Sequence, residues 1–349
     1  MTSKVAVVQV DGNESESFSQ ALRLVGGIDD LNSTERSVAV KVGVFSHRAD
    51  NHTSVAVVQS IVNSLTNAPK VFLVESDNYR GTGSERLEIW REVFSDRVVP
   101  FNLSSDTDTK KVRIAGTEME LSQVLFKPNV LVDTHILRTF QSGSILKNLL
   151  GCIPDPKKAK FHKEEILPSV LADVFEEIGG IDLAVLDGTY LWLKAGDERV
   201  PANTLLVGRD AIAVETVGAT LAGLNPERMP VIQEFVRRGL GEGDMEGIEI
   251  LGSPFEVLKE SFKEAVKTLK KKRKGAPKVW ASAIDKLIKE GFFRLPNRRT
   301  REDVEKALEA RGIAIKGKRG VIYTTLTRRV TKGTLKGARS SDGWYFWTE

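Results

Sequence analysis

The sequence predicts a doubly wound α/β domain with a largely parallel sheet in residues 1–253. A basic helical linker in 254–275 and a small winged-helix-like domain in 276–349 follow it. Three observations predict this organisation. Valine-rich segments alternate with segments of helical periodicity through most of the chain, as in parallel α/β sheets. A lysine-rich stretch then ends in Gly-Ala-Pro, and three short helical patterns with a hairpin pattern complete the 349 residues.

The first predicted strands are short, rich in valine and bounded by polar turns, as buried strands are. They occupy residues 4–10, 37–45 and 70–76. A helical pattern over residues 53–65 precedes the third strand, with Thr53 or Ser54 available as its N-cap. Its apolar residues recur near helical spacing at Val55, Val58, Ile61 and Leu65.

The alternation continues through the middle of the chain. Residues 81–94 read as a loop entering a helix. A strand over 122–133 carries Pro128 near its middle, which predicts an edge position, a bulge or two shorter pieces. Further elements are a helix over 167–179, a strand over 181–188 and a strand turning tightly into a helix over 203–224.

The C-terminal pattern is that of three helices and a two-stranded wing. The helices are expected over residues 279–293, 300–312 and 320–333, and the hairpin over 334–347 with a Ser-Ser-Asp-Gly turn. Thr300 and Asp303 resemble a capping box at the start of the second helix, and Gly312 ends it. Three helices and a hairpin in this length suggest a winged helix.

Charge is distributed unevenly along the chain. Residues 256–349 hold 25 Lys and Arg against 11 Asp and Glu, a net charge of +14, whereas residues 1–255 hold 26 against 36, a net charge of −10. This asymmetry suggests two modules, one of which has a polyanionic partner such as nucleic acid. The alternative is that the basic part docks on the acidic part.

Composition excludes several classes of protein. No apolar run approaches the roughly 20 residues that span a bilayer, and the N-terminus lacks the pattern of a signal peptide. A single cysteine excludes an internal disulfide framework, a zinc knuckle and an iron–sulfur cluster held by this chain alone. We therefore expect a cytoplasmic protein without a membrane partner.

Polar residues at the expected strand ends form the candidate site, because ligands of α/β sheets usually bind at the carboxyl edge. His135 and His162 are the candidate metal ligands, and Asp187 and Asp210 are candidate further ligands or catalytic proton acceptors. The candidate anion contacts are Lys147, Asn148, Gly81 and Gly83. No spacing among them matches an established metal signature, so ordinary structural roles stay open.

The order of these residues resembles a prokaryotic family called domain of unknown function 362. The resemblance covers roughly residues 1–253. It consists of Thr134-His135, Lys147-Asn148-x-x-Gly151, His162, Asp187-Gly188, the run from Gly208 and the glycine-rich run over residues 239–252. It implies the fold and the location of the site but no substrate, although some family members are fused to iron–sulfur modules.

This chain departs from the family pattern at several positions. Leu131 and Asp133 stand at the family's Lys-x-Lys positions, so an anion clamp there would be missing. Glu215 replaces the last Asp of the final run, and Lys41 is what remains of an early Lys-Pro-Asn.

Two functions follow as hypotheses. In the first, a His/Asp/Lys pocket binds a divalent metal ion or an anionic small molecule, and the reaction, if there is one, stays undefined. In the second, the C-terminal domain binds DNA or RNA through its third helix, in which Tyr323, Arg328 and Arg329 are the candidate contacts.

Overall fold

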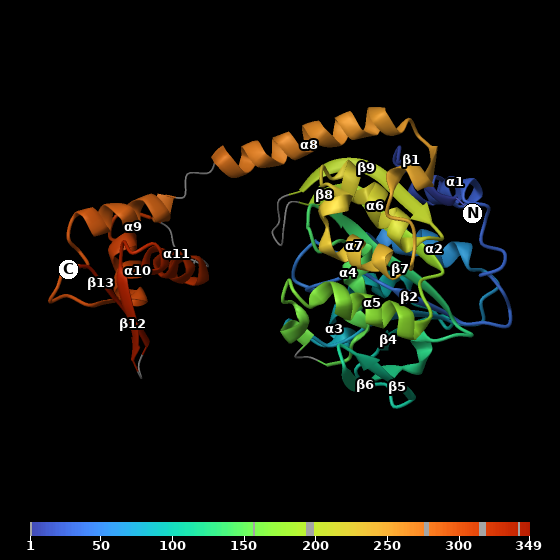
Figure 1. The fold of residues 1–349 in the computed structure, drawn as a ribbon, viewed down its shortest axis with the longest axis horizontal. Helices are drawn as coiled ribbons and strands as arrows, with labels where there is room; N and C mark the ends of the chain where they lie inside the picture. Colours follow the sequence, from blue (N-terminus) through green and yellow to red (C-terminus); the bar gives the residue numbers. More distant parts are fainter. Residues whose placement is uncertain (1, 156–157, 193–198, 276–278, 314–318, 341–342) are drawn as a thin grey trace. The chain divides into compact units, whose positions relative to one another are not determined.

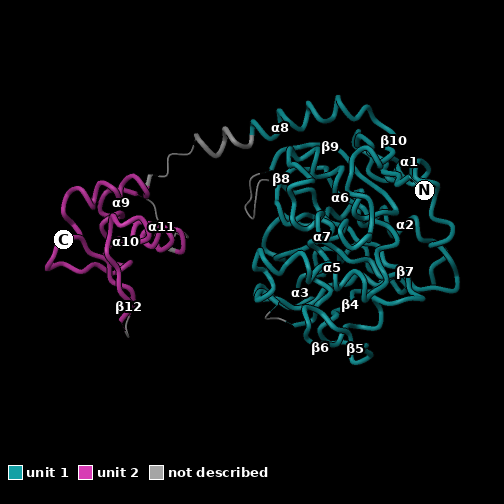
Figure 2. The backbone as a smooth tube through the Cα atoms, in the orientation of Figure 1, with its two compact units in different colours: residues 1–271 teal, residues 272–349 magenta. Residues whose placement is uncertain are grey.

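The structure, a computed structural model, describes residues 2–155, 158–192, 199–275, 279–313, 319–340 and 343–349. It divides into two compact units, unit 1 (Met1–Lys271) and unit 2 (Lys272–Glu349) (Figure 2). The expected start of the C-terminal domain at Ala276 and the expected turn residues Ser341 and Asp342 lie outside the described residues. Within the described part of the chain, no helix combines the length and the apolar character needed to cross a membrane.

A sheet of eight strands forms the centre of unit 1 in the described residues, in the order β10-β1-β9-β8-β7-β2-β3-β4 (Figure 1). Neighbouring strands are parallel except at β9, which runs antiparallel to β1 and β8. The prediction of an α/β fold with a largely parallel sheet is thus confirmed. The strands are β1 (Ser3–Gln9), β2 (Val38–Lys41), β3 (Val71–Glu75), β4 (Val98–Asn102), β7 (Val130–Arg138), β8 (Leu183–Trp192), β9 (Arg199–Gly208) and β10 (Ile248–Gly252).

Helices cover both faces of this sheet. Strand residues alternate between two apolar clusters, so that Val38 and Val40 face one cluster and Ala39 faces the other. The first face packs against α1 (Glu14–Leu24) and α2 (Val55–Ser64), together with α3 (Gly83–Leu87) and η1 (Glu88–Val93). The second packs against α4 (Ile145–Asn148), α5 (Leu167–Ile178), α6 (Ala211–Leu221) and α7 (Pro230–Arg237).

The start of β7 differs from the expected strand over 122–133. Pro128 precedes the strand, which begins at Val130 and lies in the interior of the sheet between β8 and β2. The proline therefore removes no hydrogen bond from the ladder, and neither an edge position nor a bulge is needed. Residues before it form η2 (Gln123–Leu125) and a separate hairpin of β5 (Thr109–Ile114) and β6 (Thr117–Ser122).

Helix α8 (Phe255–Gly275) occupies the segment expected to be a helical linker. Its Leu258 and Phe262 are buried in the second apolar cluster of unit 1. The first half of this helix is therefore part of the unit 1 core as well as a connection.

Unit 2 contains α9 (Val279–Lys289), β11 (Arg299–Thr300), α10 (Arg301–Glu309), α11 (Arg319–Thr331), β12 (Lys336–Ser340) and β13 (Gly343–Trp347). Its three strands form an antiparallel sheet in the order β11-β13-β12. Thr300 and Asp303 form the predicted capping box of α10. A separate core fills the unit, made of Ile284, Leu287, Phe293, Val304, Leu308, Ile322, Leu326, Leu335 and Phe346.

Candidate functional site

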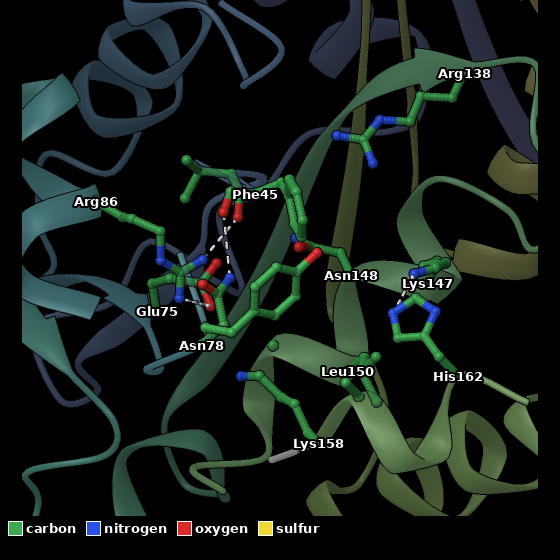
Figure 3. Close-up of a pocket in the computed structure, with 14 residues that line it drawn as sticks. Phe45, Glu75, Asn78, Arg86, Arg138, Lys147, Asn148, Leu150, Lys158 and His162 are labelled. Atoms are coloured by element: carbon green, nitrogen blue, oxygen red, sulfur yellow. Dashed lines mark hydrogen bonds and ion pairs between the residues drawn. The ribbon is translucent and has the colours of Figure 1, made fainter. Parts of the chain in front are cut away.

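A cavity of about 100 Å³ lies at the carboxyl ends of three neighbouring parallel strands of unit 1. Its walls come from the residues that follow β2 and β3, from the last residue of β7 and from the segment between α4 and η4 (Lys158–Phe161) (Figure 3). This is the edge at which α/β sheets usually bind ligands. The lining residues are Val44, Phe45, Glu75, Asn78, Tyr79, Arg86, Arg138, Lys147, Asn148, Leu150, Gly151, Lys158, Ala159 and His162.

A buried polar network links the strand ends beneath the cavity. Lys41 Nζ donates to Glu75 Oε2 at 2.9 Å, to Asn148 Oδ1 at 3.0 Å and to the Val42 carbonyl at 2.9 Å. The Asn148 amide in turn donates to Asp133 Oδ1 at 2.8 Å. All three donors of the ammonium are thereby used, so Lys41 is committed to the fold.

Glu75 is the carboxylate that lines the cavity. Burial alone would raise its pKa, but the ion pairs with Lys41 at 2.9 Å and Arg86 at 3.4 Å hold the pKa of Glu75 below its ordinary value. Arg86 is itself buried and donates to the backbone carbonyls of Val44 and Ser76. Glu75 is therefore ionised and already neutralised by these two cations.

Three further cations surround the cavity, and Glu75 attracts one of them, Lys158, without forming an ion pair with it. Figure 3 shows Arg138, Lys147 and Lys158 on different sides of it, with the Glu75–Arg86 pair opposite Lys147. None of the three forms an ion pair with a carboxylate in the described part of the chain. Arg138 donates to the Asn51 carbonyl at 3.2 Å, Lys158 to the Ile153 carbonyl at 2.9 Å, and Lys147 Nζ lies 3.1 Å from His162 Nε2.

Burial is the main cause that lowers the pKa values of these cations. Burial, with Arg138 nearby, lowers the pKa of Lys147 to about 8, and burial also lowers the pKa of Lys158 to about 8. The same cause lowers the pKa of Arg138 to about 10. Burial and the adjacent Lys147 lower the pKa of His162 to about 4, so its neutral ring can accept a hydrogen bond from the Lys147 ammonium.

The structure brings some of the predicted site residues together and separates others. Lys147, Asn148 and His162 line the cavity. His135 does not line the cavity. The expectation that His135 and His162 share one pocket is therefore not met by this cavity. The His135 ring is buried against Gly43, where an added Cβ would lie 2.6 Å from His135 Cδ2, and its Nδ1 pairs with the Ile136 carbonyl at 2.9 Å.

Asp187 fixes the start of α2. Its Oδ2 accepts from the Ser54 amide at 2.8 Å, and its Oδ1 accepts from the amide and hydroxyl of Thr189 at 3.0 and 2.6 Å. Both oxygens are therefore used within the fold, and Asp187 does not line the cavity.

Asp210 lies at the opposite edge of the sheet from the expected one. Strand β9 is antiparallel, so Gly208 at its end pairs with Val5 near the start of β1. Asp210 caps α6 by accepting from the Ile212 and Ala213 amides at 2.9 and 3.0 Å. The expectation of the carboxyl edge assumed that β9 was parallel, and the strand's direction corrects it.

The glycines expected to hold an anion form a turn beside the cavity. Gly81 has a φ of +151°, and Gly83 begins α3 and packs against Asn102. Neither lines the cavity, although Asn78 and Tyr79 of the same loop do. The loop therefore contributes side chains to the site.

Sequence reasoning did not select Arg86, Arg138 or Lys158. Arg138 ends β7, so the carboxyl-edge argument applied to the last residue of each strand could have found it. Arg86 lies in α3 and Lys158 begins the short helix η4 in a lysine-rich segment. Charged residues in such segments are usually solvated, and nothing in the local sequence distinguishes these two.

No group of three or more His, Cys, Asp or Glu side chains suited to a metal ion occurs in the described residues. Cys152 is buried, and burial raises the pKa of its thiol to about 12, which leaves it unreactive.

The predicted nucleic-acid contacts of unit 2 differ in their surroundings. Arg328 is exposed on α11, whereas Arg329 donates to Asp285 Oδ1 at 2.7 Å and to the carbonyls of Thr325 and Ala281. The Tyr323 ring packs against Trp344 with centroids 6.4 Å apart. Of these three side chains, Arg328 is therefore the one whose charged group is exposed and available to contact a nucleic acid.

A model of the family described as Domain of unknown function (DUF362) matches residues 38–220, which is more than half of the chain. Every residue that lines the cavity falls within this range. A search of the curated proteins found no match.

Proposed function

The chain belongs to the DUF362 family, and we propose that the cavity in its matched region binds the anionic group of a small molecule. The observation that carries the proposal is the excess of cations. Arg138, Lys147 and Lys158 line the cavity beside one carboxylate, Glu75, which Lys41 and Arg86 already neutralise. Lys158 is buried, and Arg138 and Lys147 are half-buried. Charges removed from water are costly unless they are paired, so a ligand with a negative charge stabilises this cluster.

The lowered pKa values support the same proposal. Burial lowers the pKa of both Lys147 and Lys158 by destabilising the charged form. Arg138 lowers the pKa of Lys147 further, whereas Glu75 partly opposes the effect of burial on the pKa of Lys158. An anion beside them stabilises the charged form and so raises both pKa values again. A phosphate or a carboxylate has the right charge, and Arg138 adds a planar donor suited to either.

A metal ion is a poorer fit to this cavity than an anion. A divalent cation would meet a surplus of positive charge, and the carboxylate present is already paired with two cations. The two histidines expected as ligands do not line the cavity together.

Titration calorimetry of the full chain with inorganic phosphate and, separately, with acetate tests the proposal. We expect binding of at least one anion, and Lys147→Met should weaken it about tenfold or more, since a hydrogen bond to a charged group contributes about 1.5–3 kcal/mol. The matched control is Lys163→Met, an exposed lysine that does not line the cavity. Absence of binding by either anion, or equal losses in the two variants, would contradict the proposal.

A second candidate function belongs to unit 2, which we propose is a winged-helix domain that binds nucleic acid. The element order α9-β11-α10-α11-β12-β13 with the strand order β11-β13-β12 supports this assignment. It makes α11 the helix that would enter the major groove. One face of α11 is exposed and carries Thr324 and Arg328. The exposed Lys332 follows directly after the helix, and the exposed Lys336 and Arg339 lie on β12.

A further inference from the structure

We infer that the ligand is anionic at one end and apolar at the other, with its apolar part in a second cavity that adjoins the first at His162. This inference rests on the proposed function and extends it to a class of ligand. It is carried by the sizes, the linings and the shared residue of the two cavities.

The first cavity holds no more than the anionic group. Its volume is about 100 Å³. A phosphate or carboxylate group fits that space, but typical small-molecule pockets measure about 300–1,000 Å³. The rest of a larger ligand must therefore extend beyond the cations.

The second cavity has the size and lining of a small-molecule pocket. It measures about 580 Å³, within that range. Apolar side chains form much of its wall: Phe140, Leu167, Pro168, Pro230 and Val231. Phe140 comes from the loop after β7, and the other four come from the first turns of α5 and α7.

The two cavities meet where the cations end. His162 lines both, and its Nε2 lies 3.1 Å from Lys147 Nζ. On another side, Arg138 lines the first cavity and its guanidinium lies 5.5 Å from the centroid of the Phe140 ring, which lines the second. A ligand whose negative group meets Lys147 and Arg138 can therefore extend past His162 onto Phe140.

The lining of the second cavity selects against another negative charge. Among the described residues that line it there is no Lys or Arg, and Glu164 supplies a carboxylate. Thr139, Gln141 and Ser142 add neutral polar groups. The ligand class that fits both cavities is a monoalkyl or aryl phosphate or a carboxylic acid with a neutral apolar body.

Calorimetric titration of the full chain with two matched pairs of ligands tests this class. The pairs are methyl and hexyl phosphate, and acetate and heptanoate. A fully buried methylene contributes about 0.8 kcal/mol, or about fourfold in affinity. We expect the longer member of the pair that binds to be at least tenfold tighter, because part of its chain stays in contact with water.

Variants at Pro168 locate the apolar part. Pro168 is half-buried in the first turn of α5, where a glutamate is compatible with the helix. Pro168→Glu should remove the tenfold advantage and leave methyl phosphate or acetate binding unchanged, whereas Pro168→Gln should keep most of the advantage.

The outcomes separate this inference from the proposed function. Equal affinity for the short and long ligands in the wild-type protein overturns the inference and leaves the anion site standing. An advantage that survives Pro168→Glu in a folded variant overturns the assignment of the second cavity. Failure of every one of the four ligands to bind overturns the proposed function and this inference with it.

Discussion

Asp133 and Glu75 are both buried carboxylates near Lys41, yet their surroundings leave them in opposite states. Glu75 forms ion pairs with Lys41 and Arg86, and its pKa lies below the ordinary value. Asp133 accepts one hydrogen bond from Asn148, and its Oδ2 has no partner in the described residues. Burial therefore raises the pKa of Asp133 to about 7, against the opposing effect of Lys41.

This difference predicts how stability depends on pH. Folded Asp133 keeps its proton up to about pH 7, whereas the unfolded chain loses it near pH 3.8. The folded state thus binds more protons between these values, and the contribution of Asp133 to stability falls as pH rises through that window. Asp133→Asn removes the cost of ionisation. It should raise the free energy of unfolding more at pH 8 than at pH 5, by on the order of 3 kcal/mol, because about two pH units of the window lie above pH 5 and each unit corresponds to about 1.4 kcal/mol.

Urea unfolding at the two pH values measures this effect. Asp11→Asn, at an exposed position, serves as the control and should show no such difference between pH 5 and pH 8. If Asp133→Asn changes the free energy of unfolding equally at both pH values, the proton is not retained in the folded state.

At the scale of the element, strand direction decides which predicted residues reach the site. The valine-rich strands, the N-cap Ser54 and the capping box at Thr300 are local patterns, and the sequence predicts them correctly. The direction of β9 is not local, since it depends on pairing with β1 and β8. Asp210 follows β9, so a prediction from local sequence alone assigns it to the wrong edge of the sheet.

The residues that line the cavity show the same limit of prediction from local sequence. The sequence predicts Lys147, Asn148 and His162 as site residues because they belong to neighbouring motifs that resemble those of the family. All three line the cavity. Arg86 and Lys158 reach the same cavity from separate elements, and only the folded chain places them beside Glu75. A site built from several elements leaves little trace in any one of them.

The position of Asp210 predicts a structural role. Besides capping α6, its Oδ2 accepts from the Ser3 hydroxyl at 2.7 Å and from the Glu242 amide at 2.9 Å. Loss of an N-cap costs about 0.5–2 kcal/mol, and the two extra bonds place Asp210→Ala at the upper end of that range. We expect a lower melting temperature with unchanged affinity for inorganic phosphate or acetate. Weakened anion binding without loss of stability would instead favour a direct role in the site.

At the scale of the whole molecule, the two units arrange their positively charged residues differently. In unit 1, three cations that form no ion pair in the described residues line one cavity at the sheet edge, where they suit a small anion. Unit 2 instead spreads exposed cations along α11 and β12, where they suit an extended polyanion. Lys and Arg side chains thus suit different ligands in the two units, because those of unit 1 line a cavity and those of unit 2 lie on an exposed surface.

Duplex DNA binding by the full chain tests the second arrangement, and the structure distinguishes two adjacent arginines. Binding should be weak and largely non-specific, with a Kd of about 10⁻⁴–10⁻⁶ M at physiological salt, and should tighten as salt falls. Arg328→Ala should reduce the slope of log Kd against log salt by about 0.9, the value for one lost phosphate contact.

Arg329→Ala should instead lower the melting temperature of unit 2, because the Arg329 guanidinium donates hydrogen bonds to Asp285 and to two backbone carbonyls. Arg294→Ala, at an exposed position in the loop after α9, is the control for charge alone. Fluorescence anisotropy of labelled DNA measures the slope. A salt-independent signal, or equal slopes for Arg328→Ala and Arg294→Ala, would contradict a role for α11 in binding DNA.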